Sequence, residues 1–553
     1  MTQIDLGNIR INWRGAYNSA TNYVRHDAVS YQGSSFIAKR AISAVTPVQG
    51  DDWDLMAAGT DQLTQEGDLL THNGAIPERL ARGGNAQVLQ MVGNQPAWRD
   101  QSLDPSRRVW KLGKVNRHGG WYTRTYLMAN GIIKACGYGG NYSNGNPTGS
   151  HIYIPSSVAT EDPDVRFVDV FTGGQQHYGL TATGEVWSWG YNNYGQLGHG
   201  DTANRSIAKR IDYFVNNNIQ IARVIPGRPN YHDYGAAYFL TTDGRLYACG
   251  YGGNGNMGTG TTSHQYTPVR CGALENIVDV GVSGLPYTIY AVEDDGSLWV
   301  WGWNAYGQLG LGDTTQRSTP ILNAAISNAV KALPVSGYQT DGNTPTGSGF
   351  VLRADGSIWA TGYNGHGQLG QGDTTQRNSF TQISRPDVFT DIFASDGRYC
   401  TVGAVNDQNE VYFWGYNGYG QLGTGNTTQQ NTPFKPNSPF QGNITRVQIA
   451  GSSSYIGCIV QAGNALWAAG YNGNGNLGFG NSNTTNNTFK EVLGVSGTIA
   501  DWSPFGHGTS PWGLGVLYDD GRVDACGENN SYGETGTRPA NLHDIQKLTN
   551  VIF

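Results

Sequence analysis

Three consecutive acidic residues could do the most specific chemistry that this sequence offers. Glu293, Asp294 and Asp295 could supply the two carboxylates that hydrolysis of a sugar polymer requires, about 5–10 Å apart. Asp295 is followed by glycine, however, and Asp-Gly is typical of a two-residue turn between antiparallel strands. We therefore expect a solvated loop closed by a turn here, and we assign no catalytic residue.

A second group of candidates shares one position in a repeated phrase that ends in Gly-Gln-Leu-Gly. The residue before this ending is aromatic in four copies, as Tyr194, Tyr306, His366 and Tyr419. A closed ring of repeats would bring these side chains to one face. Tyrosine offers a large contact area at low entropic cost, so the ring could stack on a sugar or bind a protein. The alternative is that each ring packs on the neighbouring repeat, and this sequence leaves both open.

Other chemical motifs are missing from the sequence. There is no Gly-x-Ser-x-Gly, no His-Glu-x-x-His and no phosphate-binding glycine loop followed by lysine. The six cysteines lie far apart without a Cys-x-x-Cys pair, so we expect buried free thiols rather than a zinc site or disulfides. We predict no cofactor, no metal and no enzymatic activity.

The repeated phrase itself predicts the architecture. Strong copies begin at Gly190, Gly302, Gly362 and Gly415, and weaker ones begin at Gly137, Gly250, Gly470 and Gly527. Neighbouring copies start 52 to 60 residues apart, so eight copies fill the chain from about residue 120 to its end.

The residues before each phrase indicate a β-hairpin. An apolar segment leads to a turn such as Asp243-Gly244 or Asp355-Gly356, and alternating aromatic residues such as Trp299 and Trp301 follow. A further short strand precedes each hairpin, as at Ile277-Val278-Asp279-Val280. Three or four short antiparallel strands in each repeat predict an all-β fold in which each repeat is one blade of a β-propeller.

The last residues, Leu548 to Phe553, match the strand that opens the other repeats but have no hairpin after them. We therefore expect this C-terminal strand to complete the first blade and close the ring, which would remove free sheet edges.

The phrase aromatic-Gly-x-Asn-x-x-Gly-Gln-Leu-Gly, preceded by Asp-Gly and tryptophan, resembles the regulator of chromosome condensation repeat family. The resemblance covers roughly four-fifths of the chain and implies a β-propeller over residues 108–553. Members of that family usually carry seven blades, whereas eight copies are present here. The prediction is about eight blades, with seven as the alternative.

The first hundred residues follow other patterns. Residues 1–60 contain Trp13, Tyr31 and Trp53 in an order that resembles a chitin-binding type of carbohydrate-binding module, so these three aromatic residues are further ligand-binding candidates. Residues 61–107 contain Gly67-Asp68-Leu69-Leu70 and Pro96-Ala97-Trp98, which are similar to elements of bacteriophage tail fibres. That resemblance implies a stem and linker built by three intertwined chains, and a small β domain ahead of it for virion attachment.

Composition narrows the function classes. The chain has 553 residues, 80 glycines, 14% charged residues and a net charge of −7. An acidic chain without a basic patch is a poor partner for nucleic acid, and no apolar run is long enough to span a membrane. The N-terminus has no export signal, so we expect synthesis in the host cytoplasm.

These resemblances predict a bacteriophage tail fibre, located in the virion, that binds the host cell surface through its propeller. The expected partners are a glycan or protein receptor of the host and other phage tail proteins, in a homotrimer. Two alternatives are a tailspike-like enzyme that degrades host polysaccharide and a propeller adaptor that binds another virion protein. The exchange-factor role that the repeat family suggests is disfavoured, because the acidic chain has no basic arm.

Overall fold

A computed structural model of the chain shows two units built of β-strands. The structure describes residues 123–506 and 512–528, with gaps at 228–233, 285–286, 339–343, 396–398, 438, 441 and 453–454. Elsewhere it describes the strand segments named below. The chain forms two compact units, Met1–Asp104 and Pro105–Phe553.

Short strands make up the described part of the first unit. Four of them form one sheet in the order β1-β3-β4-β6, and the other six form three two-stranded pairs, β2 with β5, β7 with β8, and β9 with β10. The bounds are β1 Asn12–Ala16, β2 Asn22–Tyr23, β3 Asp27–Tyr31, β4 Ser34–Ala38, β5 Ile42–Ser43, β6 Trp53–Ala57, β7 Leu69–His72, β8 Pro77–Leu80, β9 Gln87–Val92 and β10 Gln95–Asp100.

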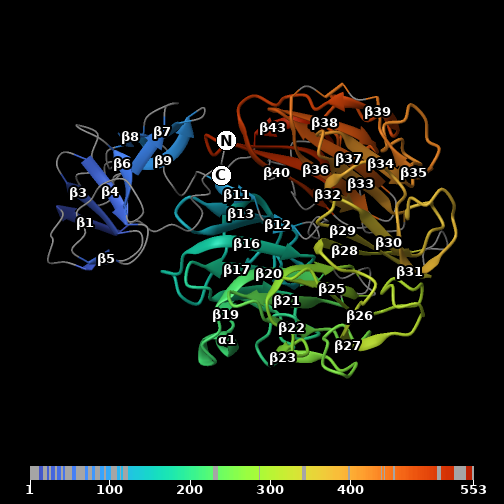
Figure 1. Cartoon of the computed structure of the whole chain (residues 1–553), viewed down its shortest axis with the longest axis horizontal. Helices are drawn as coiled ribbons and strands as arrows, with labels where there is room; N and C mark the ends of the chain where they lie inside the picture. The colour runs from blue at the N-terminus through green and yellow to red at the C-terminus, as the bar shows by residue number, and fades with distance from the viewer. Residues whose placement is uncertain are drawn as a thin grey trace. The chain divides into compact units, whose positions relative to one another are not determined.

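The second unit is a β-propeller of eight blades, which confirms the predicted all-β fold (Figure 1). Each blade is a sheet of four antiparallel strands in chain order, and a short extra strand, β12 (Lys114–Val115), pairs in parallel with β16 of blade 2. The first four blades comprise β11 Val109–Leu112, β13 Thr123–Met128, β14 Ile133–Gly137 and β15 Ile152–Ser157; β16 Phe167–Gly173, β17 Gln176–Thr181, β18 Val186–Gly190 and β19 Arg205–Arg210; β20 Ile221–Gly227, β21 Ala236–Thr241, β22 Leu246–Gly250 and β23 Gln265–Arg270; and β24 Ile277–Val282, β25 Thr288–Glu293, β26 Leu298–Gly302 and β27 Arg317–Leu322.

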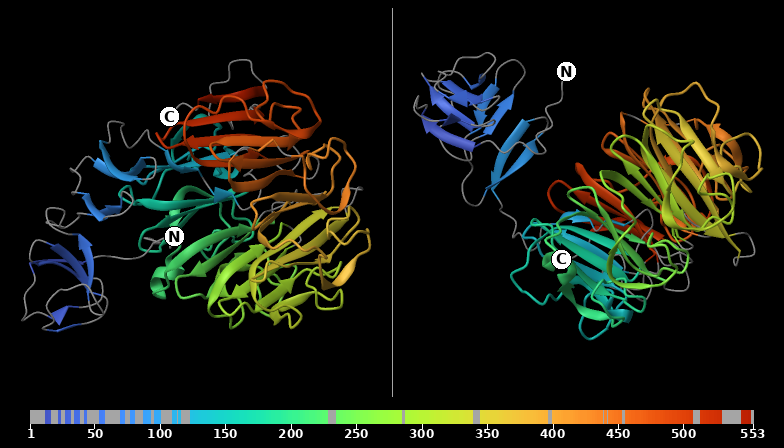
Figure 2. Two further views of the ribbon diagram at one scale, coloured as in Figure 1. Left: turned by 45° about the horizontal axis from the view of Figure 1, so that its top comes forward. Right: turned by 60° about the horizontal axis from the view of Figure 1, so that its bottom comes forward.

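Blades 5 to 8 repeat the same arrangement, and the turned views show their strands running beside one another (Figure 2). They comprise β28 Ala329–Tyr338, β29 Pro345–Arg353, β30 Ile358–Gly362 and β31 Arg377–Gln382; β32 Phe389–Ala394, β33 Thr401–Asn406, β34 Val411–Gly415 and β35 Gln430–Phe434; β36 Ile444–Ser452, β37 Tyr455–Ala462, β38 Ala465–Gly470 and β39 Asn486–Glu491; and β40 Ile499–Gly506, β41 Trp512–Tyr518, β42 Val523–Glu528 and β43 Asp544–Asn550.

Helix is almost absent from the described residues. One helix of five residues, α1 (Asp212–Asn216), follows β19, and a single 3-10 turn, η2 (Gly140–Tyr142), follows β14. No helix in the described ranges has the length and apolar character needed to cross a membrane.

Side chains between the blades form the core. Adjacent blades share clusters of buried apolar residues, and one indole in each of three blades also donates a hydrogen bond to a carbonyl of the preceding blade. The Nε1 atoms of Trp189, Trp301 and Trp414 lie 3.2, 2.8 and 2.8 Å from the carbonyl oxygens of Ser143, Asn256 and Gln368. The blades therefore stack through their faces.

The predicted ring closure is wrong. The C-terminal strand β43 pairs with β42 and completes blade 8, whereas β11 supplies the first strand of blade 1. The ring closes instead by packing, because Val109 and Leu112 share a buried cluster with Val523 of blade 8. The backbone N–H of Val109 also donates to the carbonyl of Gly521 at 3.2 Å.

All six cysteines lie in the described propeller as buried free thiols, as the sequence indicates. Burial raises the pKa of the Cys526 thiol to about 12, and it raises the pKa of Cys249, Cys271 and Cys458 as well. A thiol with a raised pKa is a poor nucleophile at neutral pH, so these residues act as small apolar side chains.

Candidate functional site: an aromatic face on one side of the propeller

The repeated loop between the third and fourth strands of a blade is held by one buried asparagine. In blade 4, Nδ2 of Asn304 donates to the carbonyls of Asp313 and Thr315, both at 3.1 Å. Oδ1 of Asn304 accepts from the backbone N–H of Leu309 at 2.8 Å. The same role belongs to Asn192, Asn364 and Asn417 in other blades. Since every polar atom of this amide is used, the loop has one well-defined shape.

A glutamine then fixes the backbone of the aromatic candidate. Oε1 of Gln308 accepts from the backbone N–H of Tyr306 at 3.0 Å, and Gln196, Gln368 and Gln421 do the same for Tyr194, His366 and Tyr419. These four aromatic residues are therefore displayed on rigid loops, which is the arrangement in which binding residues are usually found.

Each candidate ring reaches the aromatic residues of the next blade. Tyr306 meets Tyr363 edge-on with ring centroids 5.4 Å apart, and His366 lies 5.4 Å from Tyr416. Tyr419 lies 5.3 Å from Tyr471 in the same manner. The candidates are all half-buried, so each one packs on its neighbour and still presents part of its ring to solvent. Packing on the neighbouring repeat and contact with a ligand, the two interpretations that the sequence left open, are therefore compatible in this geometry.

We call the resulting surface the aromatic face. Over blades 4 to 7 it comprises two sets of rings, one with Trp303 and Tyr416 at its ends and one of Tyr419, Tyr455 and Tyr471, in which each centroid lies within 6.3 Å of another in its set. A separate group lies over blades 2 and 3. The members of the aromatic face are Trp303, Tyr306, Tyr363, His366, Tyr399, Tyr416, Tyr419, Tyr455 and Tyr471, with Tyr194, Tyr234, Tyr251 and His264 in the separate group.

The aromatic face is uncharged at neutral pH. Burial lowers the pKa of His366 and of His264 from the usual 6.5, so both imidazoles are neutral at pH 7. Burial also raises the pKa of Tyr251 and of Tyr363, so their hydroxyls stay protonated. The face therefore offers ring surfaces and hydroxyl groups, a combination suited to contact with a protein surface.

The sequence pattern identified only four of the thirteen rings of this surface. The partner rings Tyr363, Tyr416 and Tyr471 directly follow the first glycine of the phrase, so their repetition was visible in the sequence. Their position after the glycine did not reveal that they meet the aromatic residue of the preceding blade.

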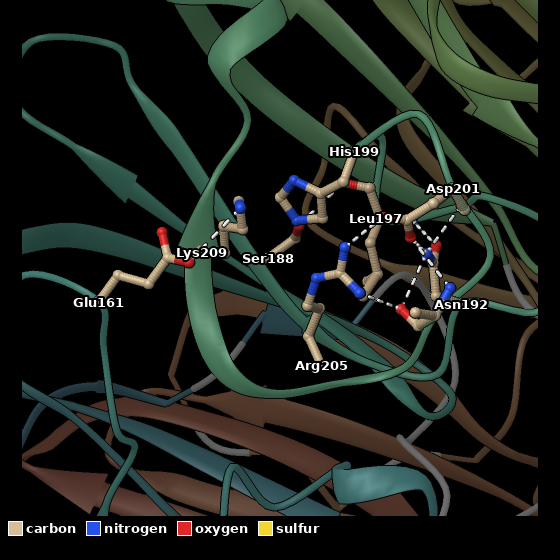
Figure 3. A network of polar contacts seen from close by, with 9 residues as sticks. Glu161, Ser188, Asn192, Leu197, His199, Asp201, Arg205 and Lys209 are labelled. Atoms are coloured by element: carbon tan, nitrogen blue, oxygen red, sulfur yellow. Dashed lines mark hydrogen bonds and ion pairs between the residues drawn. The ribbon is translucent and has the colours of Figure 1, made fainter.

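In blade 2, a serine of β18 lies close to a histidine and an aspartate of the following loop without forming a catalytic triad (Figure 3). Oγ of Ser188 lies 3.0 Å from Nε2 of His199, but this hydroxyl is fully buried and also lies 2.9 Å from the carbonyl of Leu197. The Asp201 carboxylate accepts hydrogen bonds from Arg205, Asn192 and the backbone of Ala203. The network closes the loop as Asn304 does in blade 4, and it holds no exposed nucleophile.

The same histidine gives a prediction about pH. Burial, with the nearby Arg205 and Lys209, lowers the pKa of His199 from 6.5 to about 4. Between pH 6.5 and 4 the unfolded chain binds a proton that the folded chain excludes, so stability falls as the pH falls through this window and is unaffected above it. We expect this histidine to account for about 2 kcal/mol of the loss at pH 4.5.

Urea unfolding at pH 7 and pH 4.5 measures this effect. The variant His199→Gln should show a smaller loss of stability between these two pH values than the unaltered chain. His177, whose pKa burial lowers to about 3, remains in both proteins and supplies the same background. An unchanged pH dependence in the variant would contradict the assignment.

The remaining candidates lie elsewhere. Glu293 ends β25, and Asp294 and Asp295 are the central residues of the turn, where Oδ1 of Asp295 accepts from the backbone N–H of Ser297 at 2.8 Å. Trp13, Tyr31 and Trp53 lie in β1, β3 and β6 of the first unit, and their side chains are outside the described part of the structure. Within the described residues, no three His, Cys, Asp or Glu side chains are grouped as metal ligands.

The propeller matches the model of one repeat family and resembles known proteins. The Regulator of chromosome condensation (RCC1) repeat matches residues 183–224, 243–284, 295–336 and 408–459, and a second form of the repeat matches 167–196. The ultraviolet-B receptor UVR8 of Arabidopsis thaliana is 30% identical over 316 residues, which cover 57% of this chain and 68% of the receptor. The chain belongs to the RCC1 repeat family.

The chain is also similar to a human protein and to a solved yeast structure. The human RCC1-like G exchanging factor-like protein is 27% identical over 57% of this chain and 68% of its own length. The solved structure of yeast RCC1 (Prp20) with bound Kap60 covers 74% of this chain and 94% of that chain, with a TM-score of 0.52 and 16% identity, and it shows the shared fold. The Arabidopsis relative is named as a receptor, and the human one is named as a G exchanging factor-like protein.

These relatives correct the functional prediction. The predicted tail-fibre function, the virion location, and the phage and host-receptor partners are wrong, because the relatives of the propeller are plant and human RCC1-like proteins. The tailspike and virion-adaptor alternatives are wrong for the same reason. The repeat matches lie within residues 167–459, and they do not support the phage and chitin-binding resemblances of the first hundred residues.

Proposed function

We propose that this chain is a regulatory protein that acts by binding, and that it holds a partner protein on the aromatic face. The observation that carries the proposal is the set of rings over blades 4 to 7, all half-buried except the buried Tyr471, on loops that buried Asn and Gln side chains fix. Rigid aromatic side chains give contact area at low entropic cost, and they are enriched where proteins bind one another. The names of the curated relatives, a receptor and an exchange-factor-like protein, support a role of this kind.

Crosslinking from defined positions tests the proposal. A photoreactive benzoylphenylalanine at exposed Ala305, beside Tyr306, should give a discrete protein adduct in the cells that make this chain. The matched control places the same group at exposed Asp294, in the turn of the same blade that lies on the opposite side. The adduct from position 305 should fall at least roughly tenfold when Tyr306 and Tyr419 are both replaced by alanine, because hot-spot aromatic residues contribute on the order of 2 kcal/mol or more each.

The adduct partner, purified, should then bind the full chain with a Kd that rises in the same double variant. A small G protein is the first purified candidate to titrate, because one relative is named as a G exchanging factor-like protein. Equal adducts from positions 305 and 294, or adducts that do not depend on Tyr306 and Tyr419, would overturn the proposal.

A further inference from the structure

A ring of eight charges surrounds the central channel, one from the first strand of each blade. The charged residue is the third residue of that strand in every blade, and its sign alternates around the ring without exception. In blade order the residues are Lys111, Asp169, Arg223, Asp279, Lys331, Asp391, Arg446 and Asp501.

A backbone irregularity precedes each of these side chains. All eight first strands carry a register shift between their first and third residues, as between Ile277 and Asp279 in blade 4. A β-bulge re-aims the side chain that follows it, so the repeat of the bulge accounts for the repeat of the charge position. The first strands of blades 2 to 7 line a central cavity of about 380 Å³, and Arg223, Asp279, Lys331 and Arg446 are among its lining residues.

The charges pair between neighbouring blades. The cation of each odd-numbered blade contacts the carboxylate of the next blade, with N–O distances of 3.7, 3.3, 2.5 and 2.6 Å for Lys111–Asp169, Arg223–Asp279, Lys331–Asp391 and Arg446–Asp501. Seven of the eight side chains are a quarter to a half exposed, and Asp169 is 11% exposed. Partly exposed ion pairs add little to stability, so stability alone does not explain eight charges in strict order.

The net charge of the ring is zero, so it creates no net field that would draw an ion into the channel. The alternation of sign has a different consequence. A ring of alternating charges avoids neighbours of the same sign only when the number of blades is even. If one blade were skipped, two charges of the same sign would become neighbours at the channel. The blades have nearly the same repeat, so their apolar faces are similar, and pairing with the wrong blade is a hazard of such chains.

We propose that the alternating ring specifies which blades become neighbours and closes the propeller at eight blades. Attraction between adjacent blades favours the correct order, and like-charge repulsion disfavours a ring that omits or exchanges one blade. The ring replaces the strand exchange that was expected to close the propeller, and it does not depend on the proposed binding function.

Exchanging the two charges of one ion pair distinguishes this proposal from the alternative that the ring is four independent ion pairs. The variant Lys331→Asp with Asp391→Lys keeps an ion pair between blades 5 and 6 but places a carboxylate beside Asp279 and an ammonium beside Arg446. If the whole ring matters, Tm should fall by roughly 5 °C at low salt, and 1 M NaCl should remove most of the difference. The matched control exchanges the exposed pair outside the ring, Lys209→Glu with Glu161→Lys, and should leave Tm unchanged.

Milder variants keep the test decisive if the exchanged protein does not fold. Asp279 and Lys331 are ring neighbours without a contact in the salt-bridge range, so Asp279→Asn and Lys331→Gln probe the ring between two pairs. Their Tm changes should be non-additive, as expected for charges that interact beyond contact distance. Additive changes, or wild-type Tm for the exchanged pair, would overturn the proposal and leave four independent ion pairs.

Discussion

Replacing Trp301 with alanine should lower the free energy of unfolding by about 4 kcal/mol, which is the range for removal of a large buried aromatic side chain. The indole is fully buried between blades 3 and 4, where it packs with Met257, Cys271 and Leu274. Its Nε1 also donates to the carbonyl of Asn256, and this inter-blade hydrogen bond is lost with the ring. The cost arises mainly from the cavity, because that carbonyl also accepts a hydrogen bond from Tyr238.

Urea unfolding followed by circular dichroism measures the loss. Trp110→Ala is the matched control, because this side chain is 59% exposed and its removal opens no cavity. Trp301→Phe should recover most of the stability, since the ring volume is largely kept while the hydrogen bond is not. Equal effects at positions 301 and 110 would show that the blades are not held together by these buried indoles.

The blade number could be predicted because it depends on a repeated loop whose residues are all local. Gly302, Asn304, Gln308 and Leu309 lie within one short stretch, and their hydrogen bonds close within the same loop and the strand beside it. A pattern of this kind can be counted along the chain without knowledge of the partners in space.

Ring closure and the charge ring could not be predicted in the same way. The first strand of blade 1, Val109–Leu112, is separated from its hairpin by residues 113–122. The spacing between first strand and hairpin in the other repeats therefore does not apply to this blade. Two charges of the ring, Asp279 and Asp391, stand in the short strands that the sequence predicts, but their orientation depends on a bulge that only the strand register reveals. Contacts between blades join residues that lie far apart in the sequence, such as Trp301 and Asn256 at 45 positions, and a single sequence does not reveal which residues pair in this way.

The glycine before Gln-Leu-Gly gives the second large effect, because it combines backbone strain with a contact between blades. Gly307 has a φ of +75°, and a methyl group on its Cα would lie 2.4 Å from Oδ1 and 2.5 Å from Cα of Asn378 in blade 5. Gly425 has a similar φ of +83° but open space around that position. Gly307→Ala should therefore lower the free energy of unfolding by about 3 kcal/mol or more, since left-handed strain of roughly 1–2 kcal/mol adds to overpacking of about 1–3 kcal/mol.

Gly425→Ala is the matched control and should cost only the strain, about 1 kcal/mol. The difference between the two variants in urea unfolding thus isolates the contact between a loop and the outer strand of the next blade. Gly367 and Gly420 meet Asn431 and Asn487 of the following blades in the same way, so the effect should recur at both positions. Equal losses at positions 307 and 425 would mean that the blades can shift apart to admit a methyl group, and that the glycine is required by the backbone conformation alone.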